Sequence, residues 1–275
     1  MRSYYEELLA DSKQRIDEFF HNIKLFENQF TYDEFNEKCE VLMYQKNNPE
    51  SIATVKELKA NIPELAAMCK ACAGYYMRVR NKSVKTLDVQ MGIFFEDLLV
   101  EYLSRRHGLD VVRGNINNTK YPDCVIRDTE TKKVSCYFEV KYHAAPFLTA
   151  NNMLLPKGSR LCYECSATLD KEKVAKQIDI IEQEIDVPVF YVHWIDYPCL
   201  KGIYFETVPQ VKDDLIMSSE YNRREREGDF KEMSDGTKKK KGYLAKVYPR
   251  QLTMGDFNEL IKIFTQLSQT GGIRK

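Results

Sequence analysis

The sequence contains no long hydrophobic run, no signal-peptide core and no glycine-rich phosphate loop. None of its apolar runs approaches the roughly 18 residues that a membrane-spanning helix needs. Residues 1–7 lack the apolar core of an export signal, so we expect a cytoplasmic protein with no membrane contact. The missing glycine loop leaves ATP dependence unsupported, and no serine or cysteine nucleophile signature is present.

An excess of charge of one sign is also missing, because 41 basic and 41 acidic side chains give a formal net charge of zero. DNA-binding domains are usually basic, so this total argues at first against a nucleic-acid partner, although it can hide local asymmetry. Eight cysteines are few for 275 residues and indicate reduced thiols rather than a disulfide framework. Hydrophobic residues make up 43% of the chain, which excludes a disordered protein and suffices for a large core.

The hydrophobic period changes from helical to strand-like near Gly108. Helical patterns before it cover residues 4–26, 31–42, 52–79 and 86–107. Beyond it we expect strands at 109–113, 121–128, 134–143, 187–195 and 202–207, a helix at 170–185 and a final helix at 253–267. Residues 209–242 are expected to form an irregular charged insertion, and 246–248 to pair briefly. The order helix, three strands, helix, strand predicts an α/β layer with a meander that leads into a crossover.

The third expected strand, residues 134–143, places charged side chains inside a sheet. Its alternation puts one chemically active set on one face: Tyr137, Glu139, Lys141 and His143. The other face is an ordinary core face: Phe138, Val140 and Tyr142. A short polar turn at 128–133 would bring Asp123 beside Glu139. Two carboxylates held close repel each other, and a divalent cation resolves that repulsion.

Pro122-Asp123, fifteen further residues and then Glu139-Val140-Lys141 resemble the signature of the PD-(D/E)XK nuclease superfamily, which includes most type II restriction endonucleases. The helix at 86–107 adds Glu96 among apolar positions. The resemblance covers roughly residues 86–195. It implies an α/β fold with a restriction-endonuclease-like core, a mixed central sheet flanked by helices, after an N-terminal helical region. We therefore expect a catalytic domain at 86–275, and a dimerisation or DNA-clamping region at 1–85.

The resemblance also implies the chemistry and the partners. Asp123 and Glu139, with the Val140 carbonyl and Glu96, would hold Mg²⁺, with Mn²⁺ as a substitute, and Lys141 would position the attacking water. The catalytic set is thus Asp123, Glu139, Lys141 and Glu96. The implied protein is a type II restriction endonuclease of a prokaryotic cell. It would cut double-stranded DNA as a homodimer, since two strands of a symmetric site need two active sites.

Local charge reverses the first impression given by the neutral total. Residues 70–85 contain five basic side chains and no acidic one, and residues 141–163 also lack an acid. We expect these stretches, together with the charged insertion, to contact DNA. The candidate contacts are Arg78, Arg80, Lys82, Lys85, His143, Asn151, Asn152, Lys157, Arg160, Arg223 and Arg224.

Other interpretations of these residues stay open. Glu139 and Lys141 could be a cross-strand ion pair on a solvated sheet face, and His143 could have a supporting structural role. The same fold could serve a repair or recombination nuclease that selects DNA structure. Two CxxC pairs give a zinc-like pattern, and a non-enzymatic, zinc-stabilised DNA-binding protein would use them; small core cysteines are the simpler explanation. They are Cys69 with Cys72, and Cys162 with Cys165.

Overall fold

The computed structural model describes eleven stretches of the chain. They are residues 3–23, 85–114, 121–143, 167–196, 201–217, 222–223, 230–233, 235–240, 244–247, 249 and 254–270. The helices expected at 31–42 and 52–79 lie outside these stretches.

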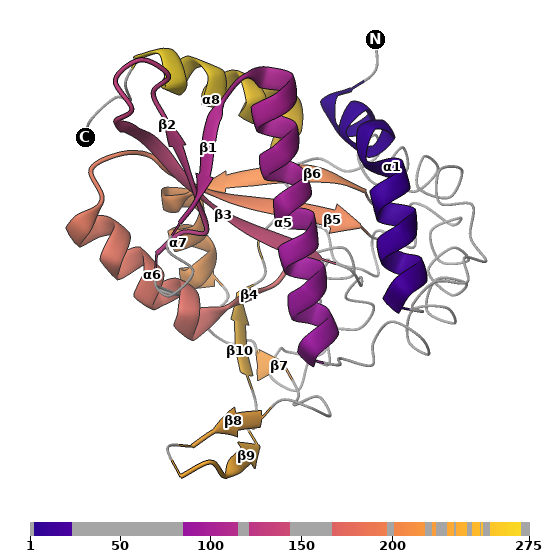
Figure 1. Cartoon of the computed structure of the whole chain (residues 1–275). Coiled ribbons are helices and arrows are strands. Elements are labelled where there is room, and N and C mark those ends of the chain that lie inside the picture. The colour runs from indigo at the N-terminus through magenta and orange to yellow at the C-terminus, as the bar shows by residue number, and fades with distance from the viewer. Residues whose placement is uncertain are drawn as a thin grey trace, which may run out of the picture.

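A six-stranded mixed sheet forms the centre of the described structure, in the order β1-β2-β3-β5-β6-β11 (Figure 1). Its strands are β1 (Asp110–Arg113), β2 (Cys124–Arg127), β3 (Val134–His143), β5 (Val189–Asp196), β6 (Lys201–Thr207) and β11 (Gly255–Asp256). β1, β2 and β3 form an antiparallel meander, β5 pairs parallel to β3, and β6 returns antiparallel. Helix α6 (Lys171–Glu184) makes the crossover between β3 and β5. The expected α/β fold with a mixed central sheet is confirmed.

Helices cover both faces of this sheet, as Figure 1 shows. Besides α6 they are α1 (Tyr4–Ile23), α5 (Lys85–His107), α7 (Val208–Met217) and α8 (Phe257–Thr270). α1, α5 and α8 pack on the face that carries Phe138 and Val140. α6 and α7 pack on the opposite face, where Tyr191 of β5 is fully buried. The predicted alternation of β3 is therefore confirmed, since Phe138, Val140 and Tyr142 lie in one core layer, and Tyr137 and Glu139 face the other.

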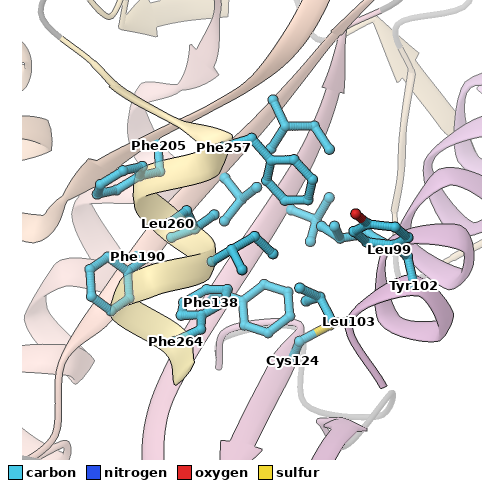
Figure 2. Packing of buried hydrophobic residues seen from close by; sticks show 14 of the residues in the cluster. Leu99, Tyr102, Leu103, Cys124, Phe138, Phe190, Phe205, Phe257, Leu260 and Phe264 are labelled. Atoms are coloured by element: carbon cyan, nitrogen blue, oxygen red, sulfur yellow. The ribbon is translucent and has the colours of Figure 1, made fainter. Parts of the chain in front are cut away.

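The larger core layer lies between β3 and helices α5 and α8 (Figure 2). Phe138 of β3 is fully buried, and its ring centroid lies 5.2 Å from that of Phe264 in α8. Leu99 of α5 and Leu8 of α1 are fully buried in the same layer. Burying a large apolar side chain contributes about 1.5–3 kcal/mol, so this layer fixes where β3 lies beneath α5.

Helix α5 ends where the sequence predicts, at a glycine. Gly108 has φ of 64°, a left-handed conformation that lacks steric cost only for glycine. Its N–H donates to the Ser104 carbonyl at 3.1 Å and so satisfies one of the orphan carbonyls of the last turn. The turn sends the chain directly into β1, which lies beside β2.

Two small sheets stand apart from the central one. β10 (Leu244–Val247) pairs with β4 (Leu169–Asp170) and with β7 (Asn222–Arg223). β8 (Phe230–Glu232) and β9 (Lys238–Lys240) form a hairpin. In Figure 1 this hairpin lies at the bottom of the view, below β10.

The prediction of an irregular insertion at residues 209–242 is wrong for the described part of that stretch. It begins inside helix α7, and it also contains the β8–β9 hairpin. Val208 and Val211 of α7 are buried against the sheet, and Leu215 packs beside them. This apolar spacing of three and four residues is helical, but the neighbouring charged residues at 212–214 obscure it in the sequence.

Candidate active site

The candidate site lies where β2 and β3 separate. Pairing with β2 reaches Phe138, opposite Cys124, whereas pairing with β5 continues to His143. Among the described residues, positions 139–143 of β3 therefore pair with β5 alone. The side of β3 that β2 leaves open is the place where Asp123, just before β2, faces Glu139.

Asp123 and Glu139 lie side by side, as the hairpin spacing predicts. The Asp123 N–H donates to Oε2 of Glu139 at 3.2 Å. In the reverse direction, the Val140 N–H donates to Oδ2 of Asp123 at 3.2 Å. Each carboxylate thus accepts a backbone hydrogen bond from the other strand, and this exchange fixes their relative position.

Glu139 has no exposed surface and is surrounded by donors. Lys141 Nζ lies 2.5 Å and Lys173 Nζ 2.9 Å from its Oε1, and Gln177 donates to its Oε2 at 2.9 Å. Burial by itself would raise the pKa of Glu139, but the two ammonium groups outweigh burial and lower this pKa to about 2. The buried group is consequently an ionised carboxylate at neutral pH.

Lys141 lies between the two carboxylates. Its Nζ is 3.8 Å from Oδ2 of Asp123 as well as 2.5 Å from Glu139. Burial would lower the pKa of Lys141, but the charges of Glu139 and Asp123 raise it above its usual value. The pKa of Asp123 is itself raised, because burial outweighs the attraction of Lys141. Glu139 and Lys141 thus do form an ion pair, but it lies within β3 rather than across strands, and on a face that α6 covers rather than a solvated one.

Glu96 approaches the site from α5. Its side chain is 15% exposed, and Oε1 contacts Nη2 of Arg113 at 2.7 Å. Burial, and next the charge of Asp123, raise the pKa of Glu96 to about 7. The prediction that this helical glutamate points inward is confirmed; its part in holding a metal stays a prediction.

Sequence reasoning missed Lys173 and Gln177, both of which contact Glu139 from α6. Gln177 is 2% exposed, and its Oε1 accepts a hydrogen bond from the Tyr191 hydroxyl at 3.0 Å. A signal was present: residues four apart share a helix face, and Gln177 stands next to Ile178 on the buried face of α6. A glutamine buried in such a stripe needs a polar partner.

His143 belongs to a buried polar chain behind Lys141. Its Nε2 lies 3.0 Å from Nδ1 of His193, whose Nε2 lies 2.9 Å from Oε2 of Glu206. Burial, and next the charge of Lys141, lower the pKa of His193 to about 3; burial and then His193 lower that of His143 as well. His143 is 8% exposed, which favours the structural role over the DNA contact, and that contact stays a prediction.

Most of the expected DNA contacts cannot be placed. Lys85 begins α5 and Arg223 lies in β7, but their side chains are outside the described part of the structure. Entirely outside the described residues are Arg78, Arg80, Lys82, Asn151, Asn152, Lys157, Arg160 and Arg224. The four cysteines of the CxxC pairs are outside it too: Cys69, Cys72, Cys162 and Cys165.

The carboxylate oxygens at the site fit a hard divalent cation. Over the described ranges, no three histidine, cysteine, aspartate or glutamate side chains converge closely enough to hold a metal ion. Mg²⁺ does not require three, because it usually takes one or two carboxylates and completes its shell with water and phosphate oxygens. Asp123 and Glu139 offer two carboxylates, and the Lys141 ammonium already lies between them as a positive charge.

The described helices include none with the length and apolar character needed to cross a membrane.

No family model matches the chain, and no curated protein matches it either. Among solved structures, it is similar to D212, a nuclease from a fusselovirus, with 12% sequence identity and a TM-score of 0.36. That similarity covers 68% of this chain and 96% of the viral one. A TM-score this low carries no weight for function. Any function proposed for the protein therefore depends on the chemistry of the site itself.

Proposed function

We propose that the protein is a divalent-metal-dependent nuclease that hydrolyses phosphodiester bonds of DNA. One observation carries the proposal: Asp123, Glu139 and Lys141 converge at the opening between β2 and β3. A fully buried carboxylate and a partly buried one, with a lysine between them, are expensive to maintain in a sheet. An arrangement so costly for stability is typical of a functional site.

Asp123 and Glu139 would hold Mg²⁺, or Mn²⁺ in its place. The Val140 carbonyl oxygen would be a third metal ligand. In an extended strand the N–H and C=O of one residue point to the same side, and the Val140 N–H points at Asp123. When bound, the metal would polarise the phosphate and lower the pKa of a water.

Lys141 would act as a hydrogen-bond donor rather than as a base. Its raised pKa keeps the amine protonated at neutral pH, and an ammonium group has three donors and no acceptor. It can therefore orient a water molecule or stabilise negative charge that develops on the phosphate oxygens.

A type II restriction endonuclease is the more specific form of this proposal. It would act as a homodimer on a short double-stranded site, and it is supported by the resemblance around Pro122-Asp123 and Glu139-Val140-Lys141. A repair or recombination nuclease of the same fold would instead cut at DNA junctions or ends. Discrete bands from an intact plasmid in Mg²⁺ support the first form, and cleavage of branched DNA alone supports the second.

Replacing Lys141 by alanine tests the proposal. We expect Lys141→Ala to slow DNA cleavage by about 10²-fold or more, while the affinity for DNA in Ca²⁺ stays nearly unchanged. Lys212→Ala is the matched control, because Lys212 is also paired with a glutamate, Glu182, but on α7. Cleavage by the Lys141→Ala protein at the wild-type rate would contradict the assigned chemistry.

A further inference from the structure

One carboxylate oxygen in the site is shared by two ammonium groups from different elements. Oε1 of Glu139 lies 2.5 Å from Lys141 of β3 and 2.9 Å from Lys173 of α6. Of these two lysines, the proposed chemistry requires only Lys141. The second ammonium therefore calls for an explanation of its own.

The two lysines are held differently. Lys141 is 28% exposed and lies between two carboxylates, whereas Lys173 is 41% exposed and reaches Glu139 from α6. Lys173 is also in the first turn of its helix, where the helix dipole disfavours a cation. Its flexible four-carbon stem allows the ammonium to move without moving the helix. Of the two, Lys173 is the one that can leave Glu139 more easily.

The charges of the site balance only in the absence of a bound cation. The ammonium groups of Lys141 and Lys173 match the carboxylates of Asp123 and Glu139 one for one. A divalent cation at these carboxylates would compete with Lys173 for the same oxygen. The added positive charge would then favour an anionic phosphate nearby.

We propose that Lys173 is a displaceable counter-ion of Glu139. Its ammonium occupies Oε1 while no divalent cation is bound, and it moves to a phosphate oxygen of the DNA backbone when a cation takes that oxygen. This inference rests on the proposed nuclease function and adds to it a second phosphate-contacting lysine. It also links metal binding to DNA binding through one side chain.

The first part of the test measures Mn²⁺ binding to the protein alone, by titration calorimetry. We expect Lys173→Met to tighten Mn²⁺ binding by about fivefold, the upper range for a partly exposed ion pair, because a competing ammonium is removed. Lys176→Met is the control, since Lys176 is an exposed lysine of the same helix, and it should bind Mn²⁺ like the wild type. Unchanged or weaker binding by Lys173→Met overturns the proposal, because a lysine that merely supports Glu139 gives that result.

The second part measures the affinity for a labelled DNA duplex over a range of salt concentrations, in Ca²⁺ and in EDTA. In Ca²⁺ we expect Lys173→Met to reduce the salt slope by about one phosphate contact, and in EDTA to leave it unchanged. The proposal is overturned if Lys173→Met and the wild type have the same salt slope in Ca²⁺. It is also overturned if Lys173→Met reduces the salt slope in EDTA as much as in Ca²⁺.

Two further results keep these outcomes separable. Lys173→Arg retains the charge and should bind Mn²⁺ like the wild type; fivefold tighter binding by this variant would contradict the competition. Lys173→Arg also provides the Mn²⁺ titration if thermal unfolding shows that Lys173→Met does not fold. A wild-type protein that neither binds nor cuts duplex DNA would overturn the proposed function. The Mn²⁺ titration would still decide whether Lys173 competes for Glu139.

Discussion

Individual residues show how a buried charge is maintained in this protein. An ionised carboxylate inside a protein is costly unless donors surround it, and Glu139 has four: the Asp123 N–H, Lys141, Lys173 and Gln177. Glu206 is equally buried, yet it lies against the neutral imidazole of His193. The first carboxylate is thus surrounded by two ammonium groups, an amide and a backbone N–H, whereas the second lies against a buried imidazole.

The buried polar chain of His143, His193 and Glu206 predicts how stability depends on pH. The folded pKa of His193, about 3, is below the ordinary value of 6.5, so the unfolded state takes up a proton first as the pH falls. Stability is therefore lost below about pH 6.5, by about 2 kcal/mol at pH 5 for one such histidine. Glu96 acts in the opposite sense, because its folded pKa of about 7 makes the folded state take up the proton first.

The contribution of His193 is isolated by comparison with a variant. Between pH 7 and pH 5, His193→Gln should lose about 2 kcal/mol less unfolding free energy than the wild type. Urea denaturation at several pH values measures this difference, and the Glu96 contribution is the same in both proteins. Parallel pH profiles for the two proteins would show that His193 is not held neutral by the fold.

At the scale of elements, the site depends on the meander of β1, β2 and β3. Gly114, after β1, donates its N–H to the Asp123 carbonyl at 2.7 Å. A Cβ at this glycine would lie 2.9 Å from the Pro122 carbonyl oxygen and 3.2 Å from that of Asp123. Both atoms are backbone, so the strand end that carries Asp123 would have to shift.

Gly114→Ala is therefore expected to lower the unfolding free energy by about 1–3 kcal/mol, as overpacking does, and to weaken Mn²⁺ binding. Gly92→Ala is the matched control, because nothing lies within 4 Å of the corresponding Cβ in α5. Alanine is the better helix former, so the control should gain about 0.5–1 kcal/mol. Urea denaturation and Mn²⁺ titration measure stability and metal binding for both variants. A Gly114→Ala protein with the stability and Mn²⁺ affinity of the wild type would contradict the role given to the Gly114–Asp123 contact.

The sequence predicts those elements whose pattern is local. β3 occupies the expected residues 134–143, because its alternation is regular from Cys136 to Tyr142, and the Asp123–Glu139 neighbourhood follows from a short turn. Asp128 closes that turn by accepting from the Thr131 N–H at 2.6 Å. Helix α7 was missed because charged residues interrupt its apolar spacing.

The positions of Lys173 and Gln177 could not be predicted in the same way. The helix at 170–185 was expected, but its contacts depend on where α6 crosses the face of β3. That crossing is fixed by long-range packing of Val174, Ile178 and Ile181 against Tyr191. No local pattern specifies such a placement, although a glutamine on the buried face of α6 indicates that a polar partner lies opposite it.

For the whole molecule, the zero net charge says little about the partner. The 41 acidic residues include Asp123, Glu139 and Glu96, which belong to the candidate site. The basic stretches expected to contact DNA lie largely outside the described residues. The predicted division near residue 85 and the homodimer stay predictions.

The homodimer has a direct test. Light scattering after gel filtration should give a mass twice that of one chain, since symmetric cleavage of a duplex needs two active sites. The same measurement with a short duplex and Ca²⁺ should give one duplex per two chains. A single chain bound to each duplex would exclude the restriction-enzyme form and leave the structure-selective nuclease.

We propose that the Asp123–Glu139–Lys141 site cleaves DNA with a divalent metal ion. The most direct measurement is incubation with a sequenced viral DNA in Mg²⁺, followed by mapping of the fragment ends, with Asp123→Asn as the inactive control. We expect fragments that form only in Mg²⁺ and whose ends recur at one short sequence, and no fragments with the Asp123→Asn protein. Intact DNA in both Mg²⁺ and Mn²⁺, or equal cleavage by the Asp123→Asn protein, would contradict this proposal.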